Sequence, residues 1–168
     1  MRPAAILIAI LLAAAALLGC GSDEGDQTIA GEAEAEEIPG GADPEEARVI
    51  SEWSTALREG DVQAAADYFK VPSSAQNGTP PLRLRTRKDV IAFNRALPCG
   101  AELIRAEDDG RFTLATFELT ERPGPGACGP GTGSTAKTAF VIEDGLITDW
   151  IRAADDPVVE PSAEGPVV

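Results

Sequence analysis

Residues 21–47 contain ten acidic side chains and no Lys or Arg, and this segment restricts the possible folds more than any other feature. It has few apolar side chains, and its like charges repel one another, so it cannot bury a core of its own. We therefore expect a flexible acidic tether over residues 20–44. The following stretch, residues 48–156, is nearly neutral, with 13 basic and 16 acidic residues. One folded domain is expected over residues 45–156, and the proline-containing end, residues 157–168, is expected to be a disordered tail.

The composition excludes several classes of function. The chain has no histidine, so it cannot build a Ser-His-Asp triad, a histidine general base or a histidine-ligated metal site. A net charge of −14 makes nucleic acid an unfavourable partner, because phosphate binding needs a basic surface. The acidic tether lacks the ligand-spaced loop of a calcium site. We expect no metal site and no cofactor.

The N-terminal residues resemble a bacterial lipoprotein signal. Arg2 precedes an apolar run, Ala4 to Leu18, that is too short and too close to the terminus for an ordinary membrane-spanning helix. The run ends in Leu17-Leu18-Gly19-Cys20, and small residues flank the cysteine. This resemblance implies a signal peptide over residues 1–19, acyl chains on Cys20, and a lipid anchor at the extracytoplasmic face of the cell membrane. A plain signal peptide with a fortuitous cysteine is the alternative.

The chain has three cysteines, and the expected location determines the state of two of them. Once lipid occupies Cys20, Cys99 and Cys128 remain in a compartment where thiols oxidise, so we expect them to form a disulfide. The bond would close 29 residue steps, for which chain entropy predicts a stabilisation of roughly 3 to 4 kcal/mol. A metal site or a redox pair would need two further ligands or a C-x-x-C spacing, and the sequence has neither.

Local patterns predict helices first and long strands afterwards. Asp43-Pro44-Glu45-Glu46 is a helix start signal, and the helix is expected to end at Gly60. A second helix is expected over Val62 to Phe69, closed by Pro72, and a third from Thr86 to the residue before Pro98. Alternating or turn-bounded segments predict strands over residues 82–85, 102–107, 111–120, 135–143 and 146–152.

One of these strands has an apparent change of phase. In 111–120, Phe112 and Leu114 have one parity, whereas Phe117 and Leu119 have the other. We therefore expect a β-bulge near Ala115 that bends the sheet and helps it to enclose a pocket.

The order of elements and the final hairpin, Phe140-Val141-Ile142-Glu143-Asp144-Gly145-Leu146-Ile147-Thr148-Asp149-Trp150, resemble the nuclear transport factor 2-like superfamily, specifically its SnoaL-like branch. The resemblance covers residues 45–154. It implies an α+β cone in which three N-terminal helices pack in a strongly curved antiparallel sheet around a central cavity. Such domains include isomerases, cyclases and dehydratases as well as members that only bind or assemble, so the fold does not settle function.

Two residues are candidates for chemistry inside such a cone. Catalytic members of the superfamily carry an Asp or His there, often with a Tyr, and the nearest matches are Asp149 and Tyr68. An Asp149 that faced an apolar cavity would have a raised pKa and could abstract a proton next to a carbonyl. The alternative is an exposed strand residue. The rings that could line a ligand cavity, or form the core instead, are those of Trp53, Phe69, Phe93, Phe117, Phe140 and Trp150.

Two other motifs have plain explanations. Arg83, Arg85, Arg87 and Lys88 form a basic cluster that could bind an anion but is also typical of a solvated sheet edge. Residues 124–129 fit G-x-G-x-x-G, yet they run into another strand and not into the helix of a nucleotide site.

We therefore expect a lipid-anchored, non-catalytic module that binds a small molecule or a partner. The alternative is an isomerase or cyclase that uses a buried carboxylate. The expected partners are the membrane through the anchor, a small apolar ligand and a second copy of the chain through the sheet.

Overall fold

The computed structural model describes residues 38–78 and 80–153. The helices are α1 (Pro44–Arg58), α2 (Val62–Asp67) and α3 (Arg87–Ala96), and a short 3-10 helix spans Gly129–Gly131. The strands are β1 (Phe69–Gln76), β2 (Leu82–Leu84), β3 (Gly100–Asp109), β4 (Phe112–Thr120), β5 (Thr135–Glu143) and β6 (Leu146–Arg152). The predicted signal peptide, Cys20, most of the predicted tether and the predicted tail lie outside the described residues. Among the described helices, none combines the length and hydropathy needed to cross a membrane.

The three predicted helix starts are confirmed, each with its capping side chain. The Asp43 carboxylate accepts hydrogen bonds from the backbone N–H groups of the first turn of α1, and Asp61 does the same for α2. Thr86 and Asp89 form a reciprocal capping box at the start of α3. These side chains satisfy backbone donors that have no partner within the helix, so a short local sequence is enough to place each start.

The second helix is shorter than predicted, and a strand that the sequence pattern did not indicate follows it. The helix α2 ends at Asp67, and β1 contains the two residues that were expected to end the helix, Phe69 and Pro72. Pro72 has no backbone N–H to donate, and it lies where the pairing of β1 with β6 shifts register, between Phe69 and Ser74. The prediction was wrong because a partner strand distant in sequence, and not local spacing, determines the conformation here.

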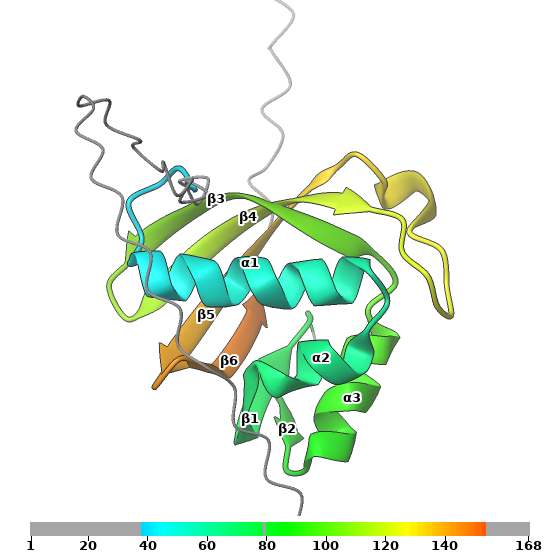
Figure 1. The fold of residues 1–168 in the computed structure, drawn as a ribbon, viewed down its shortest axis with the longest axis horizontal. Coiled ribbons are helices and arrows are strands. Elements are labelled where there is room, and N and C mark those ends of the chain that lie inside the picture. The colour runs from blue at the N-terminus through cyan, green and yellow to red at the C-terminus, as the bar shows by residue number, and fades with distance from the viewer. Residues whose placement is uncertain (1–37, 79, 154–168) are drawn as a thin grey trace, which may run out of the picture. The chain divides into compact units, whose positions relative to one another are not determined.

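The sheet is mixed, which corrects the expectation of an antiparallel sheet. The strand order is β2-β1-β6-β5-β4-β3, in which β1 runs parallel to β6 and every other neighbouring pair is antiparallel. Figure 1 shows α1 lying under the arch formed by β3 and β4, with α2 and α3 next to β1 and β2. The domain is therefore α+β, with its helices on one side of a six-stranded sheet.

The predicted bulge is in the neighbouring strand. In β4, burial alternates without a break through Thr113, Ala115 and Phe117, so this strand has no change of phase. The register shift lies in β3, where Ile104 is the extra residue between Leu103 and Arg105. Sequence parity was misleading because Phe112 and Leu114 are only half-buried, on the face opposite to the core.

Edge-to-face contacts between aromatic rings organise the core. The Trp53 ring of α1 lies 6.3 Å from Phe69, 6.2 Å from Phe117 and 5.5 Å from Phe140, measured between centroids. Phe93 of α3 contacts Phe69 and Trp150 in the same way. Such pairs contribute about 0.5–1.5 kcal/mol each beyond the burial of their area. These contacts join α1 and α3 to the sheet.

Residues 39–42, which precede the predicted domain boundary at residue 45, lie against β3. The backbone of residues 39–42 pairs with β3: Ala106 donates to the carbonyl of Pro39 at 2.9 Å, and Ala42 donates to the carbonyl of Ala106 at 3.2 Å. Gly40, with φ of 130°, lies so close to β3 that a Cβ atom would be 1.9 Å from the Ala106 oxygen. Only glycine fits this approach.

Candidate functional site

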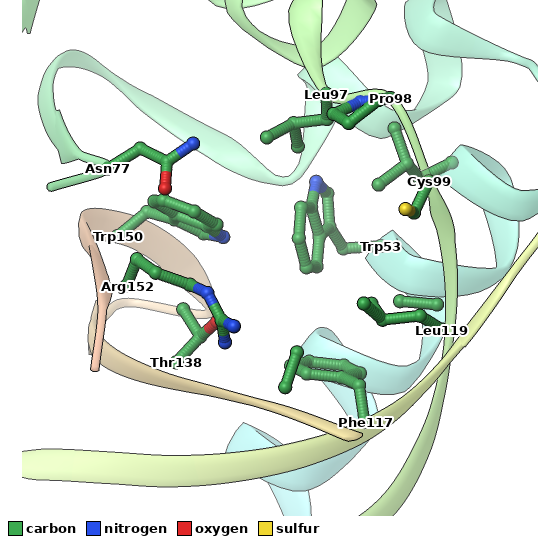
Figure 2. A pocket seen from close by; sticks show the side chains of 13 residues that line it. Trp53, Asn77, Leu97, Pro98, Cys99, Phe117, Leu119, Thr138, Trp150 and Arg152 are labelled. Carbon is green, nitrogen blue, oxygen red and sulfur yellow. The ribbon is translucent and has the colours of Figure 1, made fainter. Parts of the chain in front are cut away.

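A cavity of about 170 Å³ lies between α1, the segment after α3 and the strands β4 to β6. Four large apolar side chains of its lining, those of Trp53, Leu57, Phe117 and Trp150, are each at most 4% exposed. Leu97, Pro98 and Leu119, which are labelled in Figure 2, continue this apolar surface and are half-buried or exposed. The cavity is thus a predominantly apolar space, which is the usual character of a small-molecule site.

One side of the cavity carries polar groups. These come from Asn77, which follows β1, Thr138 of β5, and Trp150 and Arg152 of β6. Figure 2 shows these four side chains grouped on one side, opposite Trp53 and Leu97. Arg152 donates to the carbonyl of Lys137 at 2.9 Å. The buried indole nitrogen of Trp150 has no hydrogen-bond partner in the described structure.

The orientation of Trp53 depends on a buried asparagine. The Trp53 indole N–H donates to Asn94 Oδ1 at 2.9 Å, and Asn94 Nδ2 donates to the carbonyl of Val90 at 3.0 Å. Asn94 is fully buried, so both ends of its amide need partners, and these two bonds supply them. The sequence signal was available, because Asn94 is a lone polar residue on the apolar face of α3.

A buried arginine, which the sequence analysis did not single out, joins the ends of two helices beside this site. Arg122 is only 8% exposed, and its guanidinium donates to the carbonyls of Asn94 and Arg95 at 3.1 Å each and to that of Leu57 at 3.4 Å. These carbonyls belong to the last turns of α3 and α1, where a cation is favourable. Burial lowers the pKa of Arg122 from its usual value. Its position in a Gly- and Pro-rich loop offered no recognisable signal.

The predicted disulfide between Cys99 and Cys128 is confirmed, with Cα atoms 4.5 Å apart, and Cys99 also lines the cavity. Glu121 organises the same loop, because its carboxylate accepts hydrogen bonds from the backbone N–H groups of Cys128 and Gly129 and from the Thr132 hydroxyl. The Thr132 hydroxyl and these two N–H groups lower the pKa of Glu121. The loop at this edge of the cavity is therefore held covalently and by a charged acceptor.

Comparison with known proteins shows that this chain is similar in fold to several solved structures. No family model and no curated protein matches the sequence. Among solved structures, a nuclear transport factor 2-like protein of unknown function from Burkholderia xenovorans matches with a TM-score of 0.51 at 15% identity, over 70% of this chain and 88% of that one. A candidate polyketide cyclase from Sinorhizobium meliloti matches with a TM-score of 0.50 at 18% identity, over 63% of this chain and 94% of that one.

The domain has the nuclear transport factor 2-like fold. This fold alone does not indicate an activity. A de novo designed protein with a curved β-sheet matches the chain with a TM-score of 0.50 at 20% identity, over 67% of this chain and 88% of that one. The designed protein is thus as similar to this chain in fold as the candidate cyclase is. The function therefore has to be argued from the side chains.

Within this nuclear transport factor 2-like fold, the six predicted rings separate into two groups. Trp53, Phe117 and Trp150 line the cavity. The other three, which contact them from behind in the core, are Phe69, Phe93 and Phe140. Both tryptophans of the chain are therefore in the cavity wall.

Asp149 does not line the cavity of this fold. A register shift in β6 leaves Thr148 as an extra residue, so Ile147 and Trp150 are both buried despite their opposite parity in the sequence. Asp149 is half-buried and accepts a hydrogen bond from the Thr148 hydroxyl at 3.2 Å. The predicted parity of β6 is corrected by this bulge, while a catalytic role for Asp149 stays a prediction.

Tyr68 is half-buried at the end of α2 and also lies outside the cavity lining. Burial and, next, the negative charge of Glu52 raise the pKa of its phenol, so the group stays protonated at neutral pH. The structure does not bring Tyr68 into the cavity with a carboxylate.

The described residues of the cavity wall contribute apolar surfaces, the donors of Trp150 and Arg152, and the Asn77 amide and Thr138 hydroxyl, which can both donate and accept. No Asp or Glu is among the described residues that line it, and the chain has no histidine. Among the described residues, no group of three or more Cys, Asp or Glu side chains is arranged to hold a metal ion. Outside the cavity, one member of the basic cluster is engaged: Arg87 forms an ion pair with Asp67 at 2.7 Å and donates to Gln63. Among the described residues that line the cavity, there is therefore no carboxylate or imidazole to act as a general base.

Proposed function

We propose that this protein is a binding module of the SnoaL-like type that holds a small, largely apolar molecule in the cavity between α1 and the sheet. The observation that carries the proposal is the composition of the wall, an apolar floor with donors on one side and no carboxylate among the described lining residues. The alternative, an isomerase or cyclase, needs a carboxylate at the bound molecule, and Asp149 lies outside the lining.

The volume of the cavity limits the size of the ligand. A space of about 170 Å³ is close to the engineered cavity of about 150 Å³ that binds benzene in another protein. One six-membered ring with one or two additional heavy atoms fits such a space. At about 0.6 kcal/mol per heavy atom, eight atoms supply about 5 kcal/mol, which corresponds to a Kd of roughly 0.2 mM.

The location is part of the proposal. Acyl chains on Cys20, in the resemblance to a lipoprotein signal, would place the domain at the extracytoplasmic face of the membrane. The oxidised pair Cys99–Cys128 supports such a compartment, because cytoplasmic thiols are kept reduced. Association of two copies through the sheet stays a prediction, which sedimentation of residues 38–153 would test.

Intrinsic fluorescence tests the proposed binding directly. Trp53 and Trp150 are the only tryptophans of the chain and both line the cavity, so toluene entering it should change the emission. Ala136→Met should fill part of the cavity and weaken toluene binding at least fivefold, because Ala136 is a buried lining residue. Ala92→Met, at an exposed position of α3, is the matched control and should bind as the parent does.

A second pair of variants separates the cavity from the basic surface. Trp150→Ala should change toluene binding, whereas joint replacement of Arg83 and Arg85 by alanine should leave it unchanged. Loss of binding in the arginine variant alone, with both variants folded, would place the site on the surface. No emission change and no NMR shift at millimolar toluene would contradict the proposed function.

A further inference from the structure

The hydroxyl of Thr138 is a polar group on the core-facing side of β5. Burial alternates along this strand, so Thr138 shares its face with the apolar residues Ala136 and Phe140. Thr138 is only 3% exposed, and it lines the cavity. Burial of a hydroxyl costs free energy unless the group forms a hydrogen bond. This hydroxyl therefore needs a partner.

The strands on either side of Thr138 offer its O–H no acceptor. In the register of the sheet, Thr138 lies opposite Ala115 of β4 and Arg152 of β6. Residues directly opposite one another share a face of the sheet. An alanine side chain has no polar atom, and a guanidinium has donors but no acceptor. Among the described residues, none forms a hydrogen bond with the Thr138 hydroxyl.

The oxygen of Thr138 is open to the cavity. Among the described residues, the side-chain atoms that are shut off from solvent and also lack a hydrogen-bond partner belong to Ser73, Thr120, Arg122 and Trp150. The Thr138 oxygen lacks a partner too but is not in this set, so part of its surface is accessible. Because Thr138 is buried and lines the cavity, this accessible surface faces the cavity. In Figure 2 the oxygen of Thr138 is turned toward the interior of the cavity.

The largely apolar lining restricts the chemistry of a partner for this hydroxyl. An ammonium group has donors only, so it cannot accept a hydrogen bond from Thr138. A charged group would also lose its hydration among apolar side chains, and one neutral hydrogen bond does not offset that cost. An uncharged acceptor, such as a hydroxyl, ether or carbonyl oxygen, satisfies the Thr138 hydroxyl without this cost.

We propose that the ligand is a single-ring molecule with one uncharged hydrogen-bond acceptor, and that this acceptor binds the Thr138 hydroxyl. The ring lies against apolar side chains of the lining, among them Trp53 and Phe117. The inference deepens the proposed function and rests on it, since it concerns the same cavity. It requires neither the guanidinium of Arg152 nor the indole N–H of Trp150.

Three probes test the inference in titrations of the full-length protein followed by tryptophan emission. They share one phenyl ring and the same number of heavy atoms: benzonitrile carries an uncharged acceptor, ethylbenzene carries none, and benzylamine is a cation at neutral pH. Thr138→Val keeps the branched shape of the side chain and removes the hydroxyl. It should weaken benzonitrile binding about fivefold, the effect of one neutral hydrogen bond, and leave ethylbenzene binding within about twofold of the parent. Benzylamine should bind the parent most weakly.

Two further variants show whether the hydroxyl itself is responsible. Thr138→Ser keeps the hydroxyl, so it should bind benzonitrile more tightly than Thr138→Val does. The matched control is Thr135→Val, which removes an exposed hydroxyl at the start of the same strand. This control should leave the binding of every probe unaffected.

The infrared nitrile stretch of bound benzonitrile reports on the hydrogen bond in the unmodified protein. A hydrogen bond to the nitrile nitrogen raises the frequency of this stretch. The bound probe should therefore absorb at a higher frequency than benzonitrile in hexane does. The shift should be absent in Thr138→Val and present in Thr135→Val.

The other outcomes overturn the inference in distinguishable ways. Equal losses of benzonitrile and ethylbenzene binding in Thr138→Val, or a nitrile stretch at the frequency found in hexane, would refute the bound acceptor and leave the binding module intact. Tighter binding of benzylamine than of benzonitrile would refute the uncharged group. Failure of all three probes to bind would refute the proposed function as well. The infrared measurement on the unmodified protein decides the matter even if a variant fails to fold.

Discussion

Replacement of Arg122 by methionine should destabilise the domain substantially. The guanidinium donates to the carbonyls of Asn94 and Arg95 at 3.1 Å and more weakly to that of Leu57 at 3.4 Å. Two charge-assisted bonds at about 1.5 kcal/mol each, with the favourable effect of a cation at two helix ends, give about 3 to 4 kcal/mol. Relief of the desolvation that lowers the pKa of Arg122 offsets part of this sum. We expect the free energy of unfolding to fall by about 2 to 3 kcal/mol.

Urea unfolding followed by tryptophan emission measures this loss. With an m value of about 1.5 kcal/mol/M, the midpoint should fall by about 1.3 to 2 M in Arg122→Met. Arg95→Met is the control, because Arg95 is an exposed side chain in the last turn of the same helix. An exposed substitution should stay within about 0.5 kcal/mol of the parent. Equal midpoints for the two variants would refute the view that the buried guanidinium holds α1 to α3.

Three further predictions concern the loop and the anchor. Replacement of both Cys99 and Cys128 by serine should lower the free energy of unfolding by roughly 3 to 4 kcal/mol, because the disulfide closes 29 residue steps. An unchanged melting curve would contradict this prediction. Because the pKa of Glu121 is lowered in the folded protein, its ionised carboxylate stabilises the fold at neutral pH. This stabilisation is lost as the pH falls below the ordinary pKa of a glutamate and through the lowered pKa. Unfolding of Glu121→Gln between pH 7 and 2 should therefore differ from the parent most at neutral pH, and parallel curves would exclude the effect. Cys20→Ser should release the protein from membranes or leave it unprocessed, and unchanged fractionation and mature mass would count against the anchor.

The features that could be predicted from the sequence are those that depend on a few neighbouring residues. A capping side chain and the backbone donors it satisfies lie within three residues of one another, so Asp43, Asp61 and Thr86 were sufficient to place three helices. The two hairpins and their turns are local in the same sense. The pairing of Cys99 with Cys128 could be predicted because, with Cys20 assigned to lipid, no other partner remained.

The tertiary structure decided what depends on partners distant in sequence. The residues after Asp67 were expected to continue the helix but form β1, because β6 supplies backbone partners about 75 residues away in the sequence. Bulges at Ile104 and Thr148 each insert one extra residue into a strand. Beyond such a bulge, the side chains that the sequence alternation assigns to one face of the sheet lie on the other face. The site depends most on this long-range information. The sequence alone indicated a set of aromatic residues, and packing decided which three line a cavity and which donor on its wall lacks a partner.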